Sequence, residues 1–263
     1  MSRDTRALPR QDRRRLELEQ RREQRRRLRD DRPSSPLRSP IVLFTIGALA
    51  IGAVVVGFAL LGQPRPPSVD DLIQPTEIVP AALADGRTLG VADAPVTIEI
   101  WSDFQCPACG DLARRIEPPT VSTFVVPGTV RLVYHDAAFQ GARVGGNYDE
   151  SVEPAAAARC AADQGLFWQM HNWLFANQSG ENEGAYNAGR LRAIATGAGL
   201  DLATYDTCMA TGDQQAAVGS ETSAARAASI NQTPTLIING VTYVGAPSNF
   251  AEFSLVIEQA AQQ

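Results

Sequence analysis

Residues 95–116, PVTIEIWSDFQCPACGDLARRI, decide the fold of this chain. The first part of the stretch, residues 95–104, is rich in β-branched and aromatic side chains and poor in turn formers, which predicts a buried strand. A helix is predicted to begin near Cys106, and Pro118 with Pro119 are expected to stop or kink it. The predicted fold is therefore organised around a strand that passes directly into a helix with two cysteines at its first turn.

The elements that follow complete one α/β domain. Residues 129–137, TVRLVYHDA, predict a second strand, parallel to the first because a helix connects the two. Residues 151–229 look helical throughout, and a hairpin is predicted around Asn239-Gly240. A last helix is predicted with Asn249 as its N-cap. This order indicates one domain with a helical insertion rather than a repeat array.

The CPAC motif carries the chemistry that the sequence indicates. Cys106 and Cys109 are three positions apart at a helical turn, which is close enough for a disulfide bond. The first sulfur faces the unpaired N–H groups and the positive end of the helix dipole, where the pKa of a Cys falls from about 8.5 to about 3.5–7.5. Such a thiolate is a good leaving group, and its disulfide is a good oxidant. Cys106 is the candidate nucleophile and Cys109 the candidate resolving thiol; Pro107 suits a first helical turn, where no N–H is needed.

Composition narrows the chemistry further. All 24 basic residues are Arg, which excludes mechanisms that need a catalytic lysine. The motif has two other interpretations, a static disulfide and half of a metal site. A metal site needs two more ligands, but the other Cys and His residues are at least 26 positions away without partner spacing, so no metal and no cofactor are predicted.

Thr233-Pro234 stands just before the first strand of the predicted hairpin. A proline is acceptable there as the first residue of a strand or as part of a cis peptide bond. Because only about 5–6% of X-Pro bonds are cis, the residue types alone favour trans.

Residues 41–61 predict a single transmembrane helix. They form 21 consecutive residues without a charge, and about 20 helical residues span a hydrocarbon core about 30 Å thick. A cleaved signal peptide is the alternative, but its apolar region is about 7–15 residues long and ends at an A-x-A-like site. Gly57-Phe58-Ala59 matches such a site only weakly.

Charge sets the predicted topology. Residues 1–40 hold 14 Arg and 7 acidic residues, whereas Arg65 is the only basic residue within about 20 positions after the apolar segment. The positive-inside rule places the tail in the cytoplasm and the rest outside, in a compartment that tolerates disulfides. The tail is interpreted as an orientation signal, with lipid contact as an alternative; its interleaved acidic residues argue against nucleic acid. Five prolines make residues 62–84 a predicted extended spacer before the domain of residues 85–263, whose helical insertion covers about 146–229.

Cys160 and Cys208 lie on two different predicted helices of the insertion. In an oxidising compartment we expect them to form a structural disulfide, for which the loop-entropy model gives about 4 kcal/mol. Free buried thiols and a second redox relay are the alternatives. His135 and His171 are interpreted as ordinary polar or core residues rather than catalytic bases.

The sequence resembles the thioredoxin superfamily, and most closely its exported DsbA-like thiol-disulfide oxidoreductases. The resemblance covers about residues 85–263 and is carried by three stretches: DFQCPAC, AAARCAADQGLFWQMHNWLFANQ and INQTPTLIINGVTYVG. It implies a thioredoxin-like α/β fold with a helical insertion that shapes a peptide groove.

The same resemblance implies roles for individual residues. Cys106 would be the exposed nucleophile and Cys109 its buried partner, with Pro107 and Ala108 shaping the site between them. Pro234 would be a cis-proline beside the disulfide, and Thr233 would pair its backbone with the substrate.

Two features depart from the family pattern. Many relatives have a buried acid six residues before the first Cys, where this chain has Ile100. Glu99 points to the opposite face of the strand and is not assigned that role, and Asp103 is only a weak substitute. The Pro-Ala dipeptide also lacks the His of strongly oxidising relatives, so the sequence leaves the redox potential open.

The sequence thus predicts a membrane-tethered, extracytoplasmic dithiol oxidase that acts on exported proteins with free thiols. We expect a monomer, reoxidised by a membrane quinone-linked partner that the resemblance implies. A reductase or isomerase on the same scaffold is the nearest alternative. Isomerases of this type are usually dimers, and no dedicated dimerisation domain is visible, which favours the oxidase. A tethered binding or chaperone module, with CPAC as a passive staple, is the alternative from another class.

Overall fold

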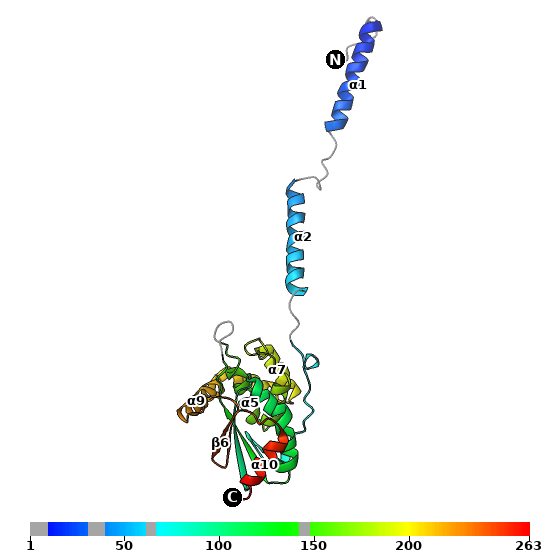
Figure 1. The fold of residues 1–263 in the computed structure, drawn as a ribbon. Coiled ribbons are helices and arrows are strands. Elements are labelled where there is room, and N and C mark those ends of the chain that lie inside the picture. Colours follow the sequence, from blue (N-terminus) through cyan, green and yellow to red (C-terminus); the bar gives the residue numbers. More distant parts are fainter. Residues whose placement is uncertain (1–9, 31–39, 62–66, 142–147) are drawn as a thin grey trace. The chain divides into compact units, whose positions relative to one another are not determined.

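The structure is a computed structural model that describes residues 10–30, 40–61, 67–141 and 148–263. The chain divides into two compact units, residues 1–65 and 66–263. The first unit contains helices α1 (Arg10–Asp30) and α2 (Pro40–Leu61) (Figure 1).

The predicted transmembrane segment falls on α2. Within the described residues, none of the helices combines the length and the apolar character that crossing a membrane requires. Part of the prediction lies outside those residues, because the side chains at positions 41–43, 55 and 59–61 are not described.

The second unit is built on a six-stranded sheet in the order β1-β2-β4-β3-β5-β6. The two central strands, β3 and β4, are parallel, and every other pair is antiparallel. Both central strands alternate between buried and half-buried residues along their whole length, as the β-branched sequence predicts. The strands are β1 (Ala84–Asp85), β2 (Thr88–Leu89), β3 (Val96–Ser102), β4 (Val130–Asp136), β5 (Thr235–Ile238) and β6 (Val241–Val244).

Pro118 and Pro119 were expected to stop or kink the first helix, and they do not stop it. The helix runs without a break through α3 (Pro107–Asp111), η5 (Leu112–Ile116), α4 (Glu117–Thr120) and η6 (Val121–Val125). Its η5 and η6 segments are wider, π-type turns on either side of the two prolines. Such turns shift the hydrogen-bond register, so the helix absorbs the missing N–H groups instead of ending.

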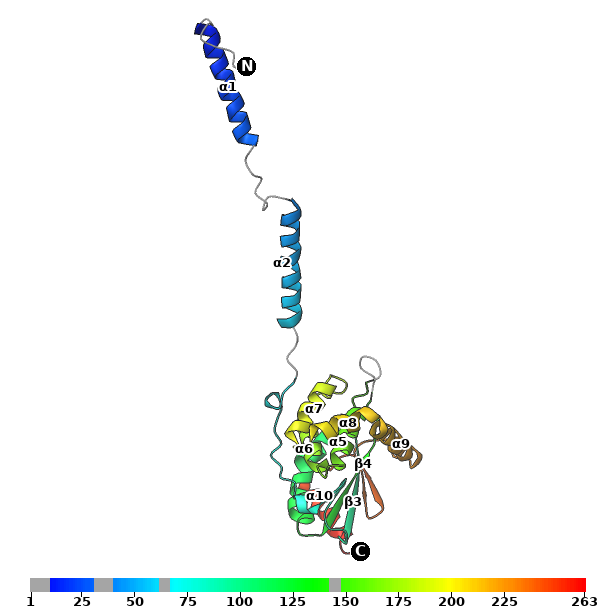
Figure 2. The same ribbon diagram turned by 180° about the vertical axis from the view of Figure 1, so that it is seen from behind.

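The helical insertion consists of five helices. Residues 153–175, which look helical in the sequence, are interrupted at Gly165, whose positive φ of 72° ends one helix before the next begins. Figures 1 and 2 show these helices grouped beyond one end of the strands, away from the C-terminus. They are α5 (Val152–Ala162), α6 (Phe167–Ala176), α7 (Ala188–Gly197), α8 (Leu202–Thr211) and α9 (Asp213–Ala227).

The C-terminal elements agree with the prediction. β5 and β6 form a hairpin, and both turn residues, Asn239 and Gly240, have positive φ. The Asn249 side chain accepts a hydrogen bond from the Glu252 N–H (2.9 Å) and caps α10 (Phe250–Ala260).

The segment before the sheet is attached to the domain. Ile73 exchanges two hydrogen bonds with the Asn177 side chain, both 2.8 Å long. The segment also forms two short helical turns, η3 (Val69–Asp71) and η4 (Ala81–Leu83). From residue 67 onward, the predicted spacer is therefore part of the compact unit.

Candidate active site

The CPAC motif lies where β3 ends and α3 begins. Cys106 is the N-cap residue of α3, with extended backbone angles, and Pro107 occupies the first turn. The Cys106 N–H donates to the Asp103 carbonyl (3.0 Å), and the Gly110 N–H donates to the Cys106 carbonyl (3.0 Å). The sulfur of Cys106 is therefore held beside the unpaired N–H groups of a helix N-terminus.

Both cysteines of the motif are free thiols, and both are buried. Cys106 is 3% exposed and Cys109 is 1% exposed. The expectation of an exposed Cys106 is thus wrong, because the Cys106 Sγ packs against the Thr233 carbonyl oxygen at 3.3 Å.

The two thiols differ sharply in acidity. A hydrogen bond from the Cys109 thiol lowers the pKa of Cys106 to about 6, aided by the N–H groups of Ala108 and Cys109 and opposed by burial. Burial raises the pKa of Cys109 well above its usual value, and the neighbouring Cys106 raises it further. At neutral pH, Cys106 is therefore a thiolate and Cys109 a thiol.

Thr233 and Pro234 lie next to Cys106 although they are far away in sequence. Strand β5, which follows them, pairs antiparallel with β3, and this pairing brings the Thr233 carbonyl to Cys106. The Thr233-Pro234 peptide bond is cis, as the resemblance implied and against the preference of the residue types alone. The Thr233 hydroxyl is buried beside Cys106 and helps to lower the pKa of that thiol.

Asp103 is more closely involved in the site than the sequence indicated. It is 2% exposed, and its carboxylate accepts hydrogen bonds from the N–H groups of Gln105 (2.9 Å) and Gln140 (2.8 Å) and from the Ser151 hydroxyl (2.9 Å). Burial raises the pKa of Asp103 to about 6, and the thiolate of Cys106 adds to the increase. Asp103 is therefore a buried carboxyl group electrostatically coupled to the candidate nucleophile.

Glu99 and Ile100 lie on the faces that the strand pattern predicted. Ile100 is 2% exposed, whereas the Glu99 side chain is 38% exposed and lies 3.7 Å from the Nε2 atom of His135. Glu99 thus faces His135 on the other side of β3.

The sequence analysis missed the residues that reach the motif from the insertion. The Gln178 side chain donates to the carbonyls of Phe104 (2.8 Å) and Cys106 (2.9 Å). The Tyr186 hydroxyl also donates to the Phe104 carbonyl, at 3.1 Å. Both residues lie in the segment between α6 and α7, which has no periodic pattern that links it to the motif.

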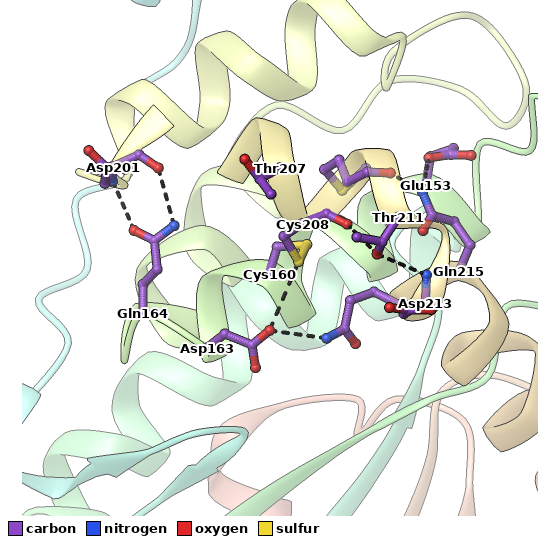
Figure 3. The surroundings of a disulfide bond; sticks show 12 residues. Glu153, Cys160, Asp163, Gln164, Asp201, Thr207, Cys208, Thr211, Asp213 and Gln215 are labelled. Atoms are coloured by element: carbon purple, nitrogen blue, oxygen red, sulfur yellow. Dashed lines mark hydrogen bonds between the residues drawn. A yellow bond between two sulfur atoms is a disulfide. The ribbon is translucent and has the colours of Figure 1, made fainter. Parts of the chain in front are cut away.

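Cys160 and Cys208 are joined by a disulfide that connects α5 to α8, with a sulfur–sulfur distance of 2.02 Å (Figure 3). Nearby, the Gln164 side chain bridges to the backbone of Asp201. The bond lies inside the helical insertion, between two elements that are not adjacent in sequence.

The two histidines have structural surroundings. His135 stacks on Trp101 with ring centroids 4.3 Å apart, and its Nδ1 lies 2.9 Å from Glu221. His171 is completely buried, which lowers its pKa to about 4, and lies 3.6 Å from Glu117. No group of three or more His, Cys, Asp or Glu side chains that could hold a metal ion occurs in the described part of the chain.

A family model described as Thioredoxin matches residues 83–259, which include the motif, the cis-proline and the whole helical insertion. The chain belongs to this thioredoxin family. Among solved structures it is similar to DsbA from Mycobacterium tuberculosis in the reduced form, with 26% identity and a TM-score of 0.56 over 68% of this chain and 93% of that chain. It also has the fold of oxidised BdbD from Bacillus subtilis, with 21% identity and a TM-score of 0.58 over 73% of this chain and 99% of that one.

Curated relatives of this thioredoxin-family chain include longer proteins. It is 29% identical over 171 residues to the Na(+)/H(+) antiporter NhaA 3 of Salinispora tropica, a match that covers 65% of this chain and 24% of that protein. It is 30% identical over 92 residues to disulfide bond formation protein D of Bacillus subtilis, covering 34% of this chain and 38% of that one. The chain thus spans about a quarter of the length of the antiporter and less than half of the Bacillus protein.

Proposed function

We propose that the chain is a thiol-disulfide oxidoreductase that works as a dithiol oxidase on exported proteins with free thiols. The observation that carries the proposal is the difference in acidity between the two thiols, with the pKa of Cys106 lowered to about 6 and that of Cys109 raised well above its usual value. A stabilised thiolate at Cys106 favours the reduced enzyme, so the oxidised enzyme readily gives up its disulfide to a substrate.

The reaction consists of two exchanges at Cys106. In the first, a substrate thiolate attacks the Cys106 sulfur, the Cys106–Cys109 bond breaks, and Cys109 leaves and takes up a proton because of its high pKa. In the second, another thiolate of the substrate attacks its own half of the mixed disulfide and releases Cys106 as a thiolate. The substrate gains a disulfide, and the enzyme gains the two electrons.

Thr233 links the binding of a substrate chain to the access of that chain to the Cys106 sulfur. Its carbonyl contacts the Cys106 sulfur in the free protein, and the same carbonyl is available to accept an N–H from an extended substrate chain. In this proposal, a substrate strand that pairs with Thr233 takes over that contact and reaches the sulfur from the same side.

The proposal also includes a membrane tether and a partner. Residues 41–61 serve as a transmembrane helix, with the Arg-rich residues 1–40 in the cytoplasm and the catalytic domain outside. Support comes from the 21 uncharged residues of the segment and from the 14 Arg that precede it. A membrane quinone-linked protein would reoxidise the cysteine pair.

The reduction potential of the pair tests the direction of the reaction. The full chain in detergent is equilibrated with glutathione buffers, and its free thiols are trapped and counted. A potential above about −180 mV supports the oxidase, whereas one near or below about −270 mV contradicts it and leaves a reductase or a structural bond.

Replacement of the nucleophile tests whether the motif is catalytic at all. We expect Cys106→Ser to abolish oxidation of a dithiol peptide, because no sulfur remains at the position of attack. If the variant keeps full activity, the motif forms only a structural disulfide and the proposed function is wrong.

A further inference from the structure

Gln178 contacts the motif at two points from outside it. This half-buried residue lies two positions after the end of α6, and its carboxamide nitrogen donates to the carbonyl oxygens of Phe104 (2.8 Å) and Cys106 (2.9 Å). The two carbonyls belong to the turn that leads into α3. One side chain of the insertion thus ties together the backbone on both sides of Gln105.

Neighbouring residues also hold the oxygen of the Gln178 carboxamide and leave space for it. The Gln178 oxygen accepts a hydrogen bond from Arg114 Nη1 (3.3 Å), and the same Nη1 also donates to the Phe175 carbonyl (2.8 Å). Gly110 leaves the necessary room, because a Cβ atom there would lie 2.1 Å from the Gln178 oxygen. The cationic Arg114 polarises the carboxamide so that its N–H groups become stronger donors.

The hydrogen bond from Gln178 compensates negative charge close to the Cys106 sulfur. A carbonyl oxygen carries partial negative charge, and the Cys106 carbonyl belongs to the same residue as the thiolate. An N–H donor that compensates this charge reduces its repulsion of the thiolate. The contact also fixes the turn, and with it the position of Cys106 relative to the N–H groups of α3.

The two carbonyls do not depend on Gln178 for a partner. The Phe104 carbonyl also accepts from the Tyr186 hydroxyl (3.1 Å), and the Cys106 carbonyl accepts from the Gly110 N–H (3.0 Å). Loss of the Gln178 contacts therefore leaves neither oxygen buried without a hydrogen bond, which limits the cost in folding stability.

We propose that Gln178 is a positioning residue that sets the reactivity of Cys106 by holding the two carbonyl groups of the CPAC turn. The inference rests on the proposed function, because it assigns to the helical insertion a direct influence on the same thiol. The insertion then tunes the nucleophile as well as covering the site.

The pH profile of Cys106 alkylation tests the inference. The reduced full chain in detergent is treated with iodoacetamide over a range of pH, and the midpoint is compared with thiolate absorbance in the ultraviolet. Cys109 does not interfere, because its pKa is raised well above the usual value. We expect Gln178→Leu to raise the midpoint by about half a unit to one unit, and the isosteric Gln178→Glu to raise it at least as much because it places a carboxylate beside the carbonyls.

Gln164→Leu is the matched control. Gln164 also bridges backbone atoms through its carboxamide, to the Asp201 N–H (2.9 Å) and carbonyl (3.2 Å), but it does so within the insertion (Figure 3). We expect this variant to keep the wild-type midpoint.

Two results are decisive. A midpoint that is unchanged in both Gln178 variants overturns the inference, and it leaves the proposed function standing if the wild-type chain turns over substrate. Equal shifts in the Gln178 and Gln164 variants overturn it as well, because they show a general effect of loosening the insertion. If Gln178→Leu does not fold, Gln178→Met takes its place, because it also removes the N–H donor without adding a charge. A wild-type chain without turnover counts against the proposed function instead.

Discussion

At the scale of single residues, the two thiols of the motif determine how redox equilibrium depends on pH. Reduction of the disulfide takes up two electrons and as many protons as the two sulfurs then bind. Below the Cys106 pKa of about 6 both sulfurs bind a proton, and above it only Cys109 does. For a two-electron couple each proton contributes about 30 mV per pH unit.

We therefore expect the reduction potential of the pair to fall by about 60 mV per pH unit below pH 6 and by about 30 mV per unit above it. Equilibration with glutathione buffers at a series of pH values measures the slope. A single slope of about 60 mV per unit through neutral pH would show that Cys106 is not a stabilised thiolate.

Glu117 is a second residue with an unusual proton equilibrium. Its side chain is 10% exposed on the helix that follows the motif, and burial raises its pKa from 4.5 to about 8. Because the folded-state pKa is the higher one, the stability linked to this proton is fully present below about pH 4.5 and is lost as the pH rises through about 8. His171 has the opposite effect, because burial lowers its pKa to about 4, so its contribution is lost as the pH falls below 6.5.

Glu117→Gln should flatten the stability profile above pH 6. In the wild type we expect the free energy of unfolding to fall by about 1.4 kcal/mol per pH unit from this residue between pH 6 and pH 7, and by less per unit as the pH approaches 8. Urea denaturation of the oxidised protein checks this, since oxidation removes the titration of Cys106. If variant and wild type have parallel profiles, Glu117 is already ionised in the folded protein.

At the scale of secondary-structure elements, α8 depends on its disulfide more than its neighbours do. Tyr205 is its only buried residue, so little apolar burial holds this helix to the core. The Cys160–Cys208 bond ties it to α5, seven of whose eleven residues are buried. The bond closes a loop across a sequence separation of 48, for which the loop-entropy model gives about 4 kcal/mol.

The double variant Cys160→Ala/Cys208→Ala should lose up to about 4 kcal/mol of unfolding free energy and keep the Cys106 alkylation midpoint. Hydrogen exchange should accelerate first in α8, because Tyr205 is the only fully buried side chain that still anchors that helix. Denaturant unfolding and exchange measured by mass spectrometry give both quantities. Unchanged exchange in α8 would show that packing alone holds the helix.

Elements with a strong local pattern could be predicted from the sequence, and those that depend on tertiary contacts could not. The alternating strand β3 and the Asn239-Gly240 turn were predicted correctly because each follows from residues close together in the chain. The helix through Pro118 and Pro119 was not, because its π-type turns are stabilised by packing that a local pattern does not reveal.

The same distinction holds for the candidate site. The lowered pKa of Cys106 could be predicted from the CPAC motif, because the start of a helix can be recognised from neighbouring residues. The burial of Cys106 against Thr233, 127 residues away, and the contact from Gln178 arise only when distant segments meet. The role of Asp103 was underestimated for the same reason, since two of its three hydrogen-bond donors, Gln140 and Ser151, are distant in the sequence.

At the scale of the whole molecule, charge is divided unevenly along the chain. Residues 1–40 carry 14 Arg and 7 acidic residues, a balance of +7, within a chain whose net charge is −5. The remainder therefore has a balance of −12. The proposed topology, in which the two ends face different sides of an anionic membrane with the uncharged residues 41–61 between them, predicts such a division.

The proposed membrane tether makes a prediction that separates insertion from surface binding. We expect the full chain expressed in bacteria to sediment with membranes and to resist extraction by alkaline carbonate. The double variant Ala50→Arg/Val54→Arg places two charges in the middle of the apolar segment, each of which costs about 2.5–3.5 kcal/mol on insertion. It should be released into the soluble fraction, whereas Ser34→Arg/Ser35→Arg, which adds the same charge to the tail, should stay with the membrane. If carbonate releases the wild-type chain, or if both double variants behave alike, residues 41–61 do not span the bilayer, and the domain must reach its substrates without this anchor.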